Sequence, residues 1–260
     1  MFRLRWVLVA VVLAIASNAS AAPIMYVHDS DGTLGRVDVA TGSVQVVGEM
    51  PQTMTDIAFD PSGNLYGVTF GALYSINAST AATTLIGSLG FSANALVFGA
   101  DGTLYGAGGS TNLFTINPAT GASSVVGDMG FASGGDLAFN GGNFYLASSN
   151  SSLVQVNPAT GAGVLIGSFG VSSVFGLATG DDGILYAVAG TNVYTVNTAT
   201  GAASNPVNYA GTALGQAFGQ SFVTEAGAPD PDPVPEPSAL VLLSLGTAAA
   251  GWARRRRSAR

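Results

Sequence analysis

The chain has 260 residues, 36 glycines, no cysteine and a formal net charge of −7. Between residues 22 and 228, Arg36 is the only cationic side chain beside twelve carboxylates, so this stretch has a net charge of −11. Such a surface cannot neutralise phosphates, which excludes nucleic acid as a partner and disfavours anionic lipid and anionic polysaccharide. A divalent cation or a neutral glycan is compatible with it. Without cysteine, packing and backbone pairing must stabilise the chain.

The N-terminus has the layout of a secretory signal peptide. Arg3 and Arg5 precede an apolar run over residues 6–16, and small residues follow. Ala19 and Ala21 fit the small-x-small cleavage rule, so we expect residues 1–21 to be removed. A transmembrane anchor is the alternative, but the apolar run is shorter than the roughly 20 residues that a span requires.

Residues 22–228 contain a repeat with a period near 40. The turn sequence Asn-Pro-Ala-Thr-Gly and its close variants begin at Asn77, Asn117, Asn157 and Asn197, and Asp38 takes the equivalent place in the first unit. Asn starts such a turn, Pro fixes φ, and Gly takes the position with φ > 0. Each unit contains four short apolar or alternating segments, which predict strands. Abundant glycine and scarce glutamate disfavour helices.

Four strands in about 40 residues predict an all-β fold, a β-propeller of about five four-stranded blades. The first unit, residues 25–50, lacks an innermost strand, and residues 214–218 supply one. We therefore expect N- and C-terminal strands to complete one blade together and to close the ring. An open β-solenoid or a sandwich is the alternative.

The composition changes after residue 228. Residues 229–237 are a proline-rich spacer. Residues 238–253 are a hydrophobic segment, for which a C-terminal helix is expected, and residues 254–260 are a basic tail. An arginine cluster stays on the cytoplasmic side of a membrane.

This C-terminal order resembles the PEP-CTERM sorting signal of Gram-negative bacteria. The resemblance covers the last 27 residues and is carried by Val234, Pro235, Glu236 and Pro237, the hydrophobic segment, and Arg254, Arg255, Arg256 and Arg257. It implies recognition by an exosortase, a membrane-inserted segment before processing, and removal of the tail. It also implies delivery to the cell envelope, the outer surface or the extracellular matrix, with a link to exopolysaccharide and biofilm formation.

Two pairs of aspartates are candidate ligand sites. Asp29 and Asp31, in an Asp-x-Asp-Gly sequence, could hold Ca²⁺, but the glutamate of a full calcium loop is missing and a polar hairpin turn is the alternative. Asp56 and Asp136 begin matched innermost strands, where they could bind calcium or a neutral sugar. The alternative is that they cap strands or bond to the neighbouring blade. His28, the single histidine, cannot build a zinc site without partners.

No set of residues in the repeats indicates catalysis. The units stay near 40 residues and lack insertions that carry reactive groups. We therefore expect no cofactor and a non-enzymatic binding or structural module, with a neutral glycan or a protein as partner. A secreted propeller lyase or hydrolase acting on a glycan is the alternative, and it rests on analogy of fold.

Overall fold

The computed structural model describes residues 22–227, which form twenty β-strands. The predicted signal peptide, spacer, hydrophobic segment and basic tail lie outside these residues. Over 22–227, no helix is long and apolar enough to cross a bilayer.

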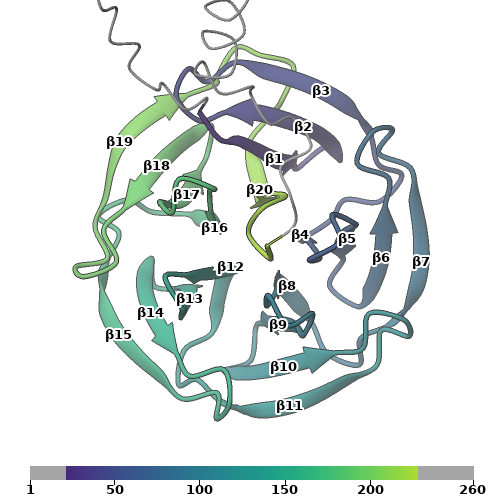
Figure 1. The fold of residues 1–260 in the computed structure, drawn as a ribbon, viewed down its shortest axis with the longest axis vertical. Helices are drawn as coiled ribbons and strands as arrows, with labels where there is room; N and C mark the ends of the chain where they lie inside the picture. The colour runs from purple at the N-terminus through teal and green to yellow at the C-terminus, as the bar shows by residue number, and fades with distance from the viewer. Residues whose placement is uncertain (1–21, 228–260) are drawn as a thin grey trace, which may run out of the picture. The chain divides into compact units, whose positions relative to one another are not determined.

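The strands form five four-stranded antiparallel sheets arranged as the blades of a propeller (Figure 1). Four of the sheets use their strands in sequence order from the centre to the rim. The first blade has β4 (Asp56–Phe59), β5 (Leu65–Val68), β6 (Ala72–Ile76) and β7 (Thr83–Ser88). The second blade has β8 (Ala93–Phe98), β9 (Leu104–Gly108), β10 (Asn112–Ile116) and β11 (Ser123–Asp128). The third blade has β12 (Ser133–Asn140), β13 (Asn143–Ser148), β14 (Ser152–Val156) and β15 (Gly163–Ser168). The fourth blade has β16 (Val174–Thr179), β17 (Leu185–Ala189), β18 (Asn192–Val196) and β19 (Ala203–Asn208).

The fifth blade joins the two ends of the domain, as the sequence predicted. Its strand order is β20 (Ala217–Ser221), β1 (Ile24–Asp29), β2 (Thr33–Asp38) and β3 (Val44–Glu49). We call it the composite blade. The innermost strand begins three residues later than predicted, because the N–H of Gly215 is held by the Asp29 carboxylate and regular pairing with β1 starts at Ala217.

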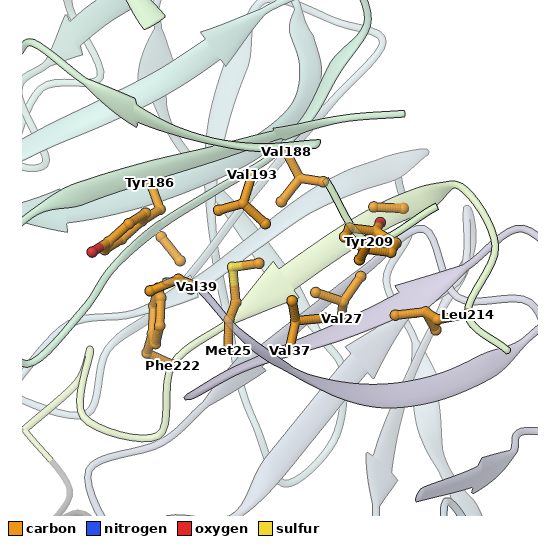
Figure 2. Packing of buried hydrophobic residues seen from close by; sticks show 12 residues of the cluster. Met25, Val27, Val37, Val39, Tyr186, Val188, Val193, Tyr209, Leu214 and Phe222 are labelled. Atoms are coloured by element: carbon orange, nitrogen blue, oxygen red, sulfur yellow. The ribbon is translucent and has the colours of Figure 1, made fainter. Parts of the chain in front are cut away.

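A buried apolar cluster seals the joint between the fourth blade and the composite blade. Figure 2 shows Met25, Val27 and Val37 of the composite blade facing Tyr186 and Val188 of the fourth blade. All five side chains are less than one-tenth exposed. Because burial of such side chains stabilises by about 1.5–3 kcal/mol each, this cluster holds the ring closed.

The repeated turns also join neighbouring blades at the rim. In the second blade, the side-chain oxygen of Asn117 accepts the N–H of Ala119 at 2.9 Å, and Gly121 donates to the Asn117 carbonyl at 2.8 Å. The tip of the same kind of turn in the third blade lies against the second blade's outermost strand, where Gly127 faces the backbone of Thr160. A side chain at Gly127 would overlap that backbone, so the glycine allows this rim contact.

Candidate functional site

The propeller axis carries the most unusual chemistry of the described residues. One position recurs near the start of each innermost strand, and in order around the ring it is occupied by Asp56, Ala95, Asp136, Gly176 and Gly219. Three of these residues are glycine or alanine, so they leave room for the two aspartates. The carboxyl groups of Asp56 and Asp136 hydrogen-bond to each other.

Backbone N–H groups of four blades' strands saturate this carboxyl pair. The oxygens of Asp56 accept from Ile57 of its own strand at 2.8 Å and from Leu96 of the second blade at 2.6 Å. Asp136 accepts from Leu137 at 2.6 Å and from Leu177 of the fourth blade at 2.7 Å. Each aspartate therefore caps its own strand and also bonds to the next blade, which are the two structural roles that the sequence analysis gave as alternatives to ligand binding.

The pair retains a proton at pH values where an isolated aspartate has lost it. Burial raises the pKa of Asp136 well above its usual range, and the neighbouring Asp56 charge raises it further. Burial also raises the pKa of Asp56, against the lowering effect of its hydrogen bond to Asp136. Two carboxyl groups in contact cannot both be ionised at low cost, so one proton bridges them.

A third carboxyl group closes the axis from the C-terminal side. After β20 the chain turns over the centre of the ring (Figure 1), and we call residues 222–227 the plug. Glu225 of the plug accepts the N–H of Thr179 in the fourth blade at 3.3 Å, and Ala226 packs into the apolar cluster of the first and second blades. Burial raises the pKa of Glu225, and the adjacent Asp136 raises it further.

His28 lies beside the axis in a position that is otherwise apolar. It pairs with Gly219, just as Val68, Ala107, Ala147 and Val188 pair with the equivalent residues of the other innermost strands. A Cβ on Gly219 would lie 2.6 Å from Nε2 of His28, so the imidazole fills the space that glycine leaves. The ring is fully buried, and burial lowers its pKa to about 4 against the raising effect of the neighbouring Asp29.

Asp29 and Asp31 do not converge on a common point. One oxygen of Asp29 accepts the N–H groups of Asp31 and Thr33, at 3.0 and 2.8 Å, and the other accepts that of Gly215 at 2.8 Å. Asp31 is exposed. Asp29 thus shapes the hairpin turn and fastens the C-terminal segment to β1.

These groups are arranged to hold the axis together. Asp56 and Asp136 are 0 % and 1 % exposed, and their oxygens are occupied by N–H donors, so a substrate has no access to them. Within residues 22–227, no group of three or more His, Asp or Glu side chains has the geometry to hold a metal ion.

Two residues of this axis were not singled out as site residues from the sequence. Glu225 follows the last innermost strand and has no counterpart in the other units, so the repeat pattern carries no signal for it. His28 could have been found by aligning the second strands, where it replaces a valine or alanine. The aspartates were found because they stand at matched repeat positions.

Comparison with known proteins bears on the tail and on the fold. Residues 233–257 match the PEP-CTERM protein-sorting motif, which confirms the predicted sorting signal. The motif implies processing by an exosortase, membrane anchoring through the C-terminal segment, and export to the cell envelope or surface. No curated protein matches the chain.

Two solved structures share the propeller architecture. One comes from a study of the de novo evolutionary emergence of a symmetrical protein, with 18% identity and a TM-score of 0.55 over 80% of this chain and 100% of that chain. The other is a chain of the nidogen/laminin complex, with 14% identity and a TM-score of 0.55 over 79% of this chain and 82% of that chain. At such identities the similarity extends to the fold alone.

Proposed function

We propose that the propeller is a non-enzymatic binding or structural module, which an exosortase delivers to the outer surface or extracellular matrix of a Gram-negative bacterium. The observation that carries this proposal is the state of the axis. The carboxyl pair of Asp56 and Asp136 at its centre is buried and bonded to backbone N–H groups of four blades. An acid or base for catalysis must reach its substrate, and these groups are enclosed.

The partner in this proposal is a neutral glycan, in keeping with a role in exopolysaccharide or biofilm. One arginine among twelve carboxylates over residues 22–228 supports that choice, since an anionic polymer would be repelled. Glycan-array binding with and without Ca²⁺ tests it. We expect neutral oligosaccharides to bind equally in both conditions. Release of shortened oligosaccharides from a bound glycan would instead support a lyase or hydrolase.

Delivery is tested separately from binding. A reporter inserted before Ala228 should reach the cell surface in the parent chain and stay with the cell interior or inner membrane when Pro235, Glu236 and Pro237 are replaced by alanine. The matched control replaces Pro229 and Pro231 of the same spacer, which precede the matched motif. Unchanged surface delivery of the first variant would contradict exosortase-dependent sorting.

A further inference from the structure

The plug is a thin cap at the axis that belongs to none of the sheets. Its middle residues, 223–225, are partly exposed, although the carboxyl pair at the centre of the ring is buried. The ladder between β20 and β1 ends at Ser221. The backbone bonds of the plug close short turns within it, such as that from the N–H of Glu225 to the Phe222 carbonyl at 3.1 Å. The plug can therefore move without breaking a strand pair.

The carboxyl group of Glu225 is the polar anchor of the plug. It accepts the N–H of Thr179 in the fourth blade at 3.3 Å, the hydroxyl of Ser221 at 3.5 Å and the backbone N–H of Phe139 in the third blade. Ser221 in turn accepts the N–H of Phe59 in the first blade at 3.2 Å. One side chain thus ties the plug to the innermost strands of three blades, so a change in its charge acts directly on the contact that holds the plug.

The innermost strands bring like charges to this anchor. Asp136 of β12 acts on Glu225 electrostatically, and Glu225 acts in the same way on Asp56 of β4. The other innermost strands, β8, β16 and β20, contain no titratable side chain. His28 of β1 borders the space over Gly219 together with Asp56, but burial lowers its pKa to about 4, so it carries no positive charge near neutral pH.

The outer side of the plug faces a different set of groups. Residues 222–224 line a small cavity together with Tyr26, Arg36 and Asp181. Arg36, the only cationic side chain between residues 22 and 228, therefore borders the residues before Glu225. The charged group that acts on the Glu225 carboxyl is Asp136. Three carboxyl groups in one enclosed place cannot all be ionised at low cost, and Glu225 is the one on the segment that can leave.

We infer that the plug is a pH-dependent latch, which closes the axis while Glu225 carries a proton and leaves the axis, with the ring of blades intact, when Glu225 ionises. Release moves the third carboxyl group away from its like-charged neighbours and into water, where its charge is solvated. It also frees residues 222–227 ahead of the sorting motif at residues 233–257, and six extended residues span about 20 Å. This inference goes beyond the proposed function and does not depend on the partner of the propeller.

The pH dependence of the latch has a definite sign. In the closed state, burial raises the pKa of Glu225 and the Asp136 charge raises it further. In the released plug the carboxyl group is in water, and its pKa returns to the ordinary value of 4.5. Release is therefore favoured by about tenfold for each unit of pH above that value, until the pH passes the closed-state pKa.

A single introduced cysteine reports the opening of the latch, because the chain has no cysteine of its own. Ala226→Cys places a thiol in the plug at a position that is 1% exposed, and Ala187→Cys is the matched control, at a fully buried position of β17 inside the fourth blade. Ala210→Cys, at an exposed position, gives the labelling rate of a free thiol at each pH. The ratio of the exposed rate to the buried rate is the protection. All variants are made in the full chain, and a thermal melt checks that each is folded.

Between about pH 5 and about pH 9, we expect the protection of the thiol at position 226 to fall by up to about tenfold per pH unit, and that at position 187 to stay constant. Glu225→Gln cannot ionise, so in its background the protection at position 226 should not change with pH. Constant protection at position 226 in the parent background would overturn the latch. An equal fall in the Glu225→Gln background would assign the opening to another group, and a parallel fall at position 187 would show that the ring opens as a whole. Either result would also overturn the inference.

Discussion

Replacing Gly127 by alanine should loosen the rim contact between the second and third blades. A Cβ at this position would lie 3.0 Å from the carbonyl carbon of Thr160 and closer still to its oxygen. Carbon atoms in contact are normally about 3.5–4.0 Å apart, and the Thr160 oxygen is nearer than the carbon, so the turn and the strand must separate by roughly 1 Å or more. Both sides are backbone, so no rotamer change can relieve the overlap. The φ angle of Gly127 is not in the left-handed region, so the penalty is steric alone.

Overpacking of this kind costs about 2 kcal/mol, within a usual range of about 1–3 kcal/mol. For a domain of this size that corresponds to a fall in Tm of about 4–8 °C. Calorimetry at pH 7 measures it. Gly109→Ala is the control, since a Cβ there meets nothing within 4 Å, and its Tm should be unchanged or slightly higher because alanine restricts the unfolded chain. Equal melting temperatures for the two variants would refute the rim contact as a source of stability.

Three further predictions concern residues at the axis, and each is measured by thermal unfolding, the first two as Tm against pH. Because the pKa of Glu225 is raised in the folded protein, the protonated side chain favours folding, and this stabilisation is lost as pH rises through the folded-state pKa. Glu225→Gln should therefore raise Tm at pH 8 and leave it unchanged at pH 4. A gain in Tm at both pH values would contradict this reasoning. The pKa of His28 is lowered to about 4, so the parent protein loses stability as pH falls from 6.5 towards 4. His28→Leu should remove that loss. An unchanged fall of Tm between pH 6.5 and pH 4 in this variant would contradict a neutral buried imidazole. Asp56→Ala leaves the N–H groups of Ile57 and Leu96 without acceptors and should cost about 3 kcal/mol, whereas Asp31→Ala, at an exposed site, should cost little.

The fold was predictable because the repeat expresses the same local rules five times. The turn that begins at Asn117 needs an acceptor side chain at its first position and φ > 0 near its end, and the sequence supplies both. Asp38 serves equally well, since its oxygen accepts the N–H of Ala40 at 2.9 Å. The first residue of β20 was less predictable, because it is set by the hydrogen bond between Gly215 and Asp29, which are far apart in the sequence.

The axis was only partly predictable, because its properties depend on which residues meet across the ring. The matched positions of Asp56 and Asp136 pointed to the centre, but not to a shared proton. That sharing requires small residues at the intervening positions, such as Ala95 and Gly176, and a ring of a particular size. A period in the sequence gives the order of the blades around the ring, while the distance across it comes from packing.

The buried acids also change how the charge of the domain should be understood. Counting residues gives −11 for residues 22–228, but the Asp56–Asp136 pair keeps one proton and the raised pKa of Glu225 favours a second. The number of negative charges on the folded domain is therefore smaller than the number of its carboxyl groups. The repulsion of anionic polymers therefore comes from exposed carboxylates at the surface, such as those of Asp31, Glu49 and Asp128, while the three acids at the axis add little to it.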